Sequence, residues 1–565
     1  MKEKIKKTNK DKKNIIKRII TIALCLIIAI FVLIKGENYL KDKKETKVNL
    51  IINNNNVTTR LKNEVKIEDG IIYLSVDDIK NFFDKYIYLE DEINEIVTTY
   101  DKKIASIGFE INKITINGAM KKTNACAKKE EEITYLPISE MTEVYNIEIA
   151  YKDAKKIVTI DSLDREQIKA YAKSKQSVKW KKEVFSKTVG KVAKGEMVIA
   201  ISQDSDGWTK VRTDKGEIGY IKTSKLTNYT TVRENWEKEK QITGKVNMFW
   251  DYFSKYVQAP DRTGQTVDGV NVVSPSFFYI DSNGELKENI GASGKAYLEW
   301  AHSNGYKVWP MISNAEAGID VTSKILNSYS KRQKLIESIV EKCVEYELDG
   351  INVDFENIYE ADKDKYSRFI IELVPRIQEV GGITSVDVTA PDGDPNWSLC
   401  YDRNVIGNVA DYLVFMAYDQ YGSSSTKPGT TAGYNWVETS LKKIIDYDEV
   451  DTEKIILGIP LYTRLWTINA DGSIASRNIV NMVDINKSIP NNVEKQWNED
   501  LKQYYVEYKS GKTTKMMWIE DGTSIAEKVS LVTKYKLGGT SCWEKDRETS
   551  NIWTVIKEEL QKTQE

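Results

Sequence analysis

Near the middle of the chain, the six residues 351–356 alternate between apolar and polar side chains. The segment 348–357 reads Leu-Asp-Gly-Ile-Asn-Val-Asp-Phe-Glu-Asn, with Asn352, Asp354 and Glu356 as the polar set. A β-strand sends alternate side chains to opposite faces, so one face carries two carboxylates and an amide. Burying such groups without partners costs roughly 2–7 kcal/mol each, and more for a charge. The polar face is therefore expected to line a cavity or cleft.

Amphipathic helical patterns flank this segment on both sides, at residues 332–346 and 366–380. By itself the alternation would suit an edge strand with one solvated face. Helix, strand and helix in series instead predict a parallel sheet that is covered by helices and buried on both faces. A polar face in such a sheet belongs inside a closed barrel, at its mouth.

The C-terminal half contains enough strand patterns to close a barrel. Eight segments qualify: 245–250, 270–278, 307–313, 350–356, 385–389, 412–418, 454–460 and 539–543. With helical patterns between most of them, they predict a (β/α)8 barrel over residues 240–562. An insertion at about 466–518 is also expected. Its segment 497–518 has the hairpin turn signal Lys509-Ser510-Gly511-Lys512, and we expect it to wall one side of the cleft.

The segment Asp349-Gly350-Ile351-Asn352-Val353-Asp354-Phe355-Glu356 closely resembles the Asp-Gly-x-Asp-x-Asp-x-Glu signature of glycoside hydrolase family 18. This family contains TIM-barrel chitinases and N-acetylglucosaminidases. The departure is Asn352, where the common pattern has Asp. Because the spore-cortex and cell-wall branch of the resembling proteins often carries Asn there, the departure indicates peptidoglycan as the substrate.

Three more segments match the family in the expected order. Met416-Ala417-Tyr418-Asp419 is similar to its sixth-strand motif, and residues 457–464 are similar to its seventh. Residues 538–544 are similar to the eighth, where the family places a tryptophan, here Trp543, under the reacting sugar. Together the matches cover residues 240–562 and make a chance resemblance improbable.

The chemistry of a glycosidase can be argued from the residues themselves. Glu356 lies nearest the carboxyl end of its strand, where TIM-barrel active sites are found, so it is the expected proton donor. Asp354 lies two residues deeper on the same face. Two carboxylates that close cannot both ionise cheaply, so the pKa of one rises and Glu356 can keep its proton near neutral pH.

No separate carboxylate stands out as a nucleophile. The resemblance implies substrate assistance, in which the 2-acetamido oxygen of the sugar attacks the anomeric carbon with retention of configuration. It implies that Asp354 orients the acetamido group and that Tyr418 donates to its carbonyl oxygen. It also places Asn352, Asp419, Tyr462, Arg464 and Trp543 at the substrate. Trp397, Trp466, Glu520 and Asp521 are further candidates for the lining of the cleft.

The sequence therefore predicts a retaining glycosidase that acts on peptidoglycan or a related N-acetylglucosamine polymer. Two alternatives stay open. One is a chitinase or an endo-N-acetylglucosaminidase that acts on other glycans. The other is a non-catalytic lectin that binds the cell wall with the same barrel, although Glu356 is intact here.

The N-terminus has the pattern of a membrane anchor. Residues 1–18 are rich in lysine, and every residue of 19–34 except Thr21 is apolar. Lysines on the N-terminal side keep that end in the cytoplasm, and no small-residue cleavage site follows. We expect a single-pass anchor at 19–35 with the catalytic domain outside the cell membrane. The alternative is a secreted, wall-located protein.

Two further domains are expected between the anchor and the barrel. The segment 72–79 recurs at 134–141, and this repeat over residues 48–162 resembles the copper amine oxidase N-terminal-like domain, although it contains no His to bind copper. Residues 176–229 show short strand patterns with glycine turns and resemble the bacterial SH3-like domain. Such domains imply wall association or spacing.

Composition excludes several other classes of function. The 82 basic and 84 acidic side chains give no net field that would attract nucleic acid. The single His302 cannot support a Ser-His-Asp triad or a His-rich metal site, and the five cysteines show no paired spacing. We therefore expect no metal and no other cofactor.

Overall fold

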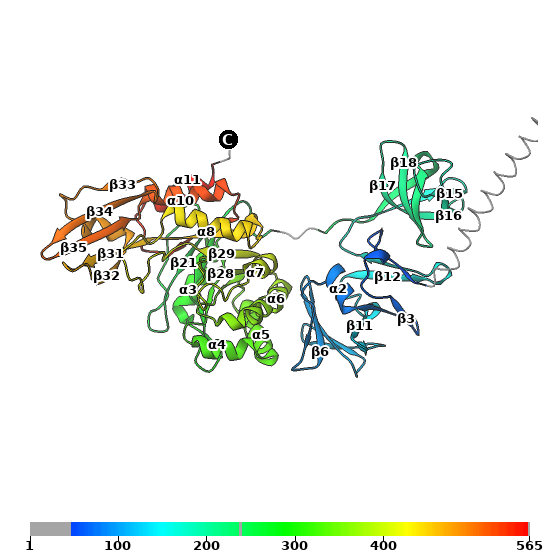
Figure 1. Ribbon diagram of the computed structural model, residues 1–565, viewed down its shortest axis with the longest axis horizontal. Coiled ribbons are helices and arrows are strands. Elements are labelled where there is room, and N and C mark those ends of the chain that lie inside the picture. The colour runs from blue at the N-terminus through cyan, green and yellow to red at the C-terminus, as the bar shows by residue number, and fades with distance from the viewer. Residues whose placement is uncertain (1–46, 237–239, 563–565) are drawn as a thin grey trace, which may run out of the picture. The chain divides into compact units, whose positions relative to one another are not determined.

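The computed structural model describes residues 47–236 and 240–562 (Figure 1). The predicted basic tail at 1–18 and anchor at 19–35 lie outside these residues. Within the described ranges, no helix has the length and apolar character needed to cross a membrane. The chain divides into two compact units, Met1–Phe82 with Lys128–Trp236 and Phe83–Ala127 with Glu237–Glu565. The domain boundaries given above stay predictions.

The second unit contains a closed barrel of parallel strands, as the sequence predicts. Its strands are β21 (Val246–Asp251), β22 (Val272–Pro275), β25 (Lys307–Val308) continued by β26 (Met311–Ser313), β27 (Gly350–Asp354), β28 (Ile383–Val388), β29 (Tyr412–Met416), β30 (Ile455–Pro460) and β36 (Gly539–Trp543). Strand β21 pairs with both β22 and β36, which closes the ring. A short hairpin of β23 (Phe278–Ile280) and β24 (Leu286–Glu288) lies beside β26.

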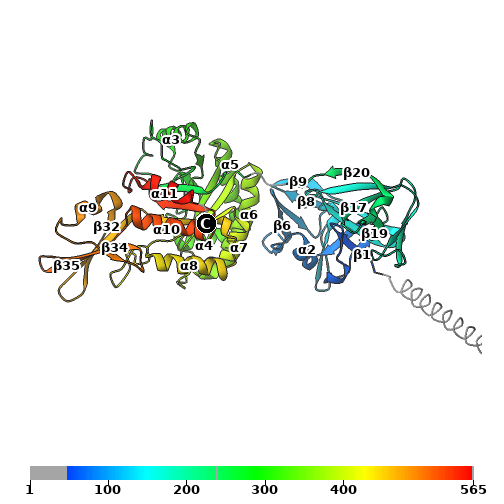
Figure 2. The same ribbon diagram turned by 90° about the horizontal axis from the view of Figure 1, so that it is seen from above.

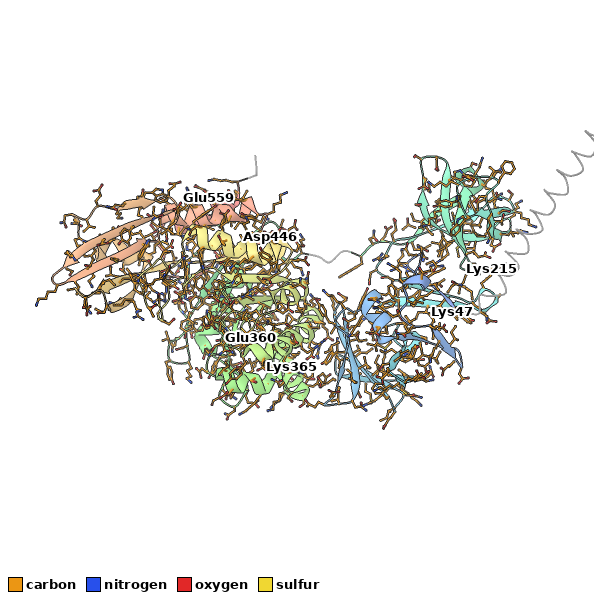
Figure 3. The ribbon with its side chains drawn as sticks, viewed as in Figure 1. Lys47, Lys215, Glu360, Lys365, Asp446 and Glu559 are labelled. Carbon is orange, nitrogen blue, oxygen red and sulfur yellow. The ribbon has the colours of Figure 1, made fainter. Side chains whose placement is uncertain are left out.

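Helices surround the barrel strands (Figures 1 and 2). They are α3 (Gly291–Ser303), α4 (Gly318–Leu326), α5 (Tyr329–Glu345), α6 (Lys363–Glu379), α7 (Arg403–Val409), α8 (Tyr434–Asp446), α10 (Gly522–Lys534) and α11 (Ile552–Leu560). Their apolar faces form one core with the outward side chains of the strands, including Ile351, Val353 and Phe355. Charged residues such as Lys365 and Asp446 lie on the exposed side of the helices (Figure 3).

The expected insertion after β30 is a five-stranded antiparallel sheet. Its strands are β31 (Tyr462–Ile468), β32 (Ile474–Asn481), β33 (Gln496–Asn498), β34 (Gln503–Ser510) and β35 (Thr513–Ile519), with the short helix α9 (Ile485–Ser488). Strands β34 and β35 form the predicted hairpin, in which Ser510 is opposite Thr513. Gly511 takes the left-handed conformation that this turn requires, with φ of 61°. The hairpin extends away from the barrel (Figure 1).

A second antiparallel sheet belongs to the same unit and lies against the barrel helices α5 and α6. It consists of β5 (Tyr88–Glu90), β6 (Glu95–Tyr100), β7 (Lys103–Gly108), β8 (Lys113–Ile116) and β9 (Ala119–Lys122). Buried Arg332 of α5 joins Glu90 of this sheet to Glu372 of α6. The Tyr88 hydroxyl donates to the same Glu372 at 2.6 Å.

The first unit contains the internal repeat. Its elements are β1 (Asn49–Ile52), β2 (Asn55–Asn56), β3 (Lys66–Glu68), β4 (Ile71–Ser75), α2 (Val76–Phe82), β10 (Lys128–Glu130), β11 (Ile133–Pro137), β12 (Ile147–Lys152) and β13 (Ile157–Ser162). The two copies of the repeated strand, β4 and β11, pair with each other in antiparallel fashion. Repeated sequences thus form equivalent strands of one sheet.

The rest of the first unit is a seven-stranded antiparallel sheet with a small core of its own. Its strands are β14 (Gln167–Ala172), β15 (Gln176–Lys179), β16 (Thr188–Val192), β17 (Met197–Gln203), β18 (Trp208–Thr213), β19 (Ile218–Lys222) and β20 (Leu226–Arg233). These are the short strands that the glycine turn signals predict.

Candidate active site

Strand β27 carries the polar row into the barrel. It pairs with β26 on one side and with β28 on the other, so its polar face looks toward the barrel axis. The strand ends at Asp354, two residues earlier than the sequence pattern predicts. The reason is a change of hydrogen-bond partner, because the Glu356 N–H donates to the Asn314 side chain and not to a neighbouring strand.

Asn352 is fully buried and all of its hydrogen-bonding positions are used. Its Oδ1 accepts from Trp250 Nε1 at 2.7 Å and from Ser274 Oγ at 3.3 Å. Its Nδ2 donates to Ser385 Oγ at 3.0 Å and to Asp387 Oδ1 at 2.7 Å. The amide therefore connects β27 with β21, β22 and β28 across the barrel, and it is satisfied as a buried polar group must be.

Three carboxyl groups gather above this amide. Burial is the main cause that raises the pKa of Asp354 to about 6. Burial, and next the nearby Asp354, raise the pKa of Glu356 well above its ordinary value. Burial and Asp354 do the same for Asp387. Glu356 is therefore equipped to keep a proton at neutral pH, as the sequence predicts.

The peptide backbone that carries Glu356 is held on both sides. Asn314 Nδ2 donates to the Glu356 carbonyl oxygen at 2.9 Å, while Asn314 Oδ1 accepts from the Glu356 N–H at 2.9 Å. The Tyr401 hydroxyl donates to the carbonyl oxygen of Phe355 at 2.8 Å. These contacts fix where the carboxyl end of the strand places the Glu356 side chain.

Aromatic residues from the ends of four other strands meet at the same place. The Tyr418 ring lies 6.5 Å from the ring of Trp250 and 6.5 Å from that of Tyr462. The Trp543 ring lies 5.7 Å from that of Trp250. Burial raises the pKa of the Tyr418 hydroxyl well above its ordinary value, so it stays a hydrogen-bond donor.

Asp419 takes the left-handed backbone conformation, with φ of 57°. This conformation is uncommon outside glycine but is tolerated by Asp. The Tyr462 hydroxyl donates to Asp419 Oδ1 at 2.8 Å, and the Arg464 guanidinium donates to the same oxygen at 3.0 Å. The structure thus brings Asp419, Tyr462 and Arg464 together beside Tyr418.

Two cavities open on either side of the carboxyl groups, with volumes of about 340 and 380 Å³. Both are lined by Asp354, Glu356, Trp397 and Trp543. The first also includes Asp387, Tyr418 and Asp419, and the second includes residues of the loops after β21, β22 and β26. Neither lining contains a Lys, Arg or His residue. This is a cleft with room for saccharide units on both sides of Glu356.

Several expectations for the cleft lining were wrong. Trp466 is fully buried, and its Nε1 donates to the Gly429 carbonyl oxygen at 2.8 Å. Glu520 is also fully buried and bonds Lys528, while Asp521 caps the N-terminus of α10. Neither cavity is lined by a residue of the insertion at 466–518. Trp397 does line both cavities, as expected.

Sequence reasoning missed Asp387 and Asn314. Asp387 is the only charged residue of β28, a strand that is buried along its whole length. A charge in such a strand is a signal that could have been used. Asn314 had no comparable signal, because its contact to Glu356 is made between a loop and a strand end. No group of three or more His, Cys, Asp or Glu residues in the described ranges is arranged to hold a metal ion.

Comparison with known proteins agrees with this geometry. Residues 245–548 match the model of glycosyl hydrolases family 18. The chain belongs to this family. It is therefore a glycoside hydrolase by family, and its barrel is the catalytic domain of that family.

Relatives of this family member include bacterial glycosylases. It is 26% identical over 300 residues to the uncharacterized glycosylase YvbX of Bacillus subtilis, which covers 51% of this chain and 84% of the relative. It is 24% identical over 243 residues to a cortical fragment-lytic enzyme of the same organism, which covers 42% of this chain and 55% of the relative. A chitinase structure from Chromobacterium violaceum shares the fold, with a TM-score of 0.50 at 22% identity over 56% of this chain and all of that chain.

Proposed function

We propose that this family 18 protein hydrolyses peptidoglycan at an N-acetylhexosamine residue, with retention of configuration and with the substrate's acetamido group as the nucleophile. The observation that carries the proposal is the pair Asp354 and Glu356, which lies at the mouth of the barrel and lines both cavities. The raised pKa of Glu356 suits a general acid.

The residues divide into three roles. Glu356 donates a proton to the leaving glycosidic oxygen. Asp354 accepts a hydrogen bond from the acetamido N–H at a carboxylate oxygen, each of which has two lone pairs. Tyr418 donates to the acetamido oxygen, and Trp543 forms the floor under the sugar ring. An oxazolinium ion that forms in this way meets a carboxylate and no nearby cation.

Peptidoglycan is favoured over chitin for two reasons. One relative carries the name cortical fragment-lytic enzyme. In addition, Asn352 replaces the more common Asp of the signature, as in the cell-wall branch that the sequence resembles. The N-terminal repeat and the small seven-stranded sheet would then serve as an amine oxidase N-terminal-like and an SH3-like module for wall association.

The test compares the two substrates directly. Full-length protein in detergent is incubated with purified peptidoglycan or with chitin, and released fragments are reduced with borohydride and identified by mass spectrometry. We expect peptidoglycan fragments with new reducing N-acetylhexosamine ends. Release from chitin alone would replace peptidoglycan by chitin as the substrate, and release from neither would contradict the proposal.

We also propose that residues 19–35 anchor the protein, with the enzyme on the outer side of the cell membrane. The support is the lysine-rich segment before the apolar run and the missing cleavage site. The N-terminus of the mature protein decides this point by mass spectrometry. An intact N-terminus in the membrane fraction is expected, whereas an N-terminus between about residues 35 and 47, with protein in the medium, would show a secreted enzyme.

A further inference from the structure

The residue that departs from the family signature is paired with a carboxyl group on the next strand. Strands β27 and β28 run parallel, with Asn352 opposite Ser385 and Val353 opposite Val386. The next pair in this register is Asp354 and Asp387. Neighbouring strands lie about 4.8 Å apart, and both side chains point into the same cavity. Asp387 is thus the carboxyl on β28 that adjoins Asp354.

The orientation of the Asn352 amide fixes the orientation of Asp387. Trp250 Nε1 can only donate, so the atom that it contacts at 2.7 Å must be the amide oxygen of Asn352. The amide nitrogen then donates to Asp387 Oδ1 at 2.7 Å. Oδ1 of Asp387 is therefore occupied as an acceptor, and a proton on this carboxyl belongs on Oδ2.

Asp354 offers the matching acceptor. Its Oδ1 is buried and has no hydrogen-bond partner in the protein, which is costly for a carboxylate. Asp354, Glu356 and Asp387 are buried close together in a cavity whose lining contains no cation, so all three cannot be ionised at once. Burial raises the pKa of Asp354 to about 6, and burial together with Asp354 raises the pKa values of Glu356 and Asp387 well above their ordinary range. Because Asp354 lies between the other two carboxyl groups, it is the one whose negative charge both neighbours can stabilise by keeping their protons.

We propose that Asp387 is a positioning residue that donates its Oδ2 proton to Oδ1 of Asp354. It thereby holds the Asp354 carboxylate in place while Glu356 gives its own proton to the leaving oxygen and regains one from the attacking water. In this protein Asp387 supplies, from the neighbouring strand, the second carboxyl that the common signature places at position 352. Asn352 allows the second carboxyl group to lie on β28. An Asp at position 352 would instead put two carboxyl groups within hydrogen-bond distance of each other, because residue 352 contacts Asp387 at 2.7 Å. The inference rests on the proposed function.

The test exchanges the two groups. D387A removes both the acceptor for Asn352 and the proton donor to Asp354, whereas D387N keeps both contacts, because Asn Oδ1 accepts and Asn Nδ2 donates. We therefore expect kcat to fall about tenfold in D387A and to stay close to the wild-type value in D387N. Both variants remove the carboxyl whose ionisation at alkaline pH raises the pKa of Glu356, so the alkaline limb of kcat/KM moves down by about one pH unit. N352D adds a carboxyl next to Asp387, so the alkaline limb moves up. In N352D/D387N the amide and the acid have changed places, and the limb should return to its wild-type position.

The other titratable groups around Asp354, Glu356 and Asp387 cannot account for the expected movements of the alkaline limb. They are Tyr366, Tyr401, Tyr418, Tyr462, Asp392 and Asp419. Burial holds the pKa of each of the four phenols far above the range of the assay, and Asp419 is paired with Arg464. The control is D411N, because Asp411 accepts from the Thr384 N–H at the opposite end of β28. It should leave the alkaline limb in place.

The outcomes separate the inference from the proposed function. If wild-type protein cleaves no glycan, the proposed function fails. If wild type is active but D387A has the same kcat as wild type, Asp387 is not a positioning residue. If the alkaline limb of folded N352D/D387N stays where D387N alone puts it, the exchange is wrong. Should D387A fail to fold, the upward shift in N352D and its reversal in the double variant still decide the question.

Discussion

Two buried carboxyl sites in the same barrel have opposite surroundings. Glu520 is fully buried beside Lys528 at 2.9 Å, and its two oxygens also accept from Gln503 and Ser524. In the cleft, Asp354, Glu356 and Asp387 share a space whose lining contains no cation. One oxygen of Asp354 is left without a partner in the protein.

The difference separates carboxyl groups that serve the fold from those that serve chemistry. Burial raises the pKa of Glu520 as well, but Lys528, Gln503 and Ser524 bond both of its oxygens, so this carboxyl is committed to contacts within the fold. Carboxyl groups buried without a cation keep raised pKa values and an open acceptor, which is what acid catalysis and substrate orientation need. The following experiments test either the paired carboxyl of Glu520 or the carboxyl groups of the cleft, and the experiment with the strongest expected effect comes first.

The largest effect should come from the substrate. If Asp354 only orients the acetamido group, none of the three carboxyl groups acts as a nucleophile. De-N-acetylated peptidoglycan then lacks the atom that attacks the anomeric carbon. Because intramolecular attack is worth an effective molarity of about 10⁵–10⁸ M, the rate should fall more than about 10⁴-fold. Fragment release is measured for acetylated and de-N-acetylated strands of equal length. Equal rates would require a protein nucleophile, with Asp419 as the first candidate.

Removing the cation from the paired site should destabilise the fold. K528M leaves Glu520 as an unpaired buried charge, and breaking such a pair typically costs about 3–5 kcal/mol of unfolding free energy. Urea unfolding measures the change. The matched control is K534M, which breaks the surface pair between Lys534 and Glu438 and should cost at most about 1 kcal/mol. Equal costs for the two variants would show that burial of Glu520 contributes little.

Removing the charge of Asp354, which has no paired cation, should instead increase the unfolding free energy at alkaline pH. The pKa of Asp354 is raised from 3.8 to about 6 in the folded state, so its contribution to stability is present below the unfolded pKa and is lost as the pH rises through about 6. D354N should therefore stabilise the protein at pH 8, by up to about 3 kcal/mol, and change little at pH 4.

Urea unfolding of D354N at both pH values checks this prediction. D392N is the control, because Asp392 lines the same cavity but is exposed to solvent. A loss of stability in D354N at pH 8 would mean that hydrogen bonds to the Asp354 carboxylate outweigh the cost of burying its charge, contrary to the contrast drawn above.

The smallest effect concerns the support of Asp419. Y462F removes one hydrogen bond of 2.8 Å to Asp419 Oδ1, while the Arg464 contact stays. A hydrogen bond contributes about 0.5–1.5 kcal/mol, so kcat/KM should fall roughly two- to tenfold. Y505F, on the exposed hairpin where Tyr505 donates to Glu507, is the control and should not change kcat/KM. A fall of several hundredfold in kcat/KM of Y462F would indicate that Tyr462 contacts the substrate directly.

Much of the fold and part of the site could be predicted from the sequence. All eight barrel strands were found, because apolar periodicity and strand burial are local signals. The row Asn352, Asp354 and Glu356 was found for the same reason. Partners across strands were not, since the contact between Asn352 and Asp387 depends on the register of β27 and β28. Trp466 and Glu520 were misplaced in the cleft, because residue type does not reveal which face of a sheet is covered.

The most direct test of the central claim measures activity and stability on the same variant. E356Q keeps the shape of Glu356 and removes its proton and its charge. We expect kcat on peptidoglycan to fall by about 10²–10⁴-fold, while the unfolding free energy at pH 8 stays equal to that of wild type or rises. Near-wild-type turnover, or loss of turnover together with a loss of stability, would contradict the account.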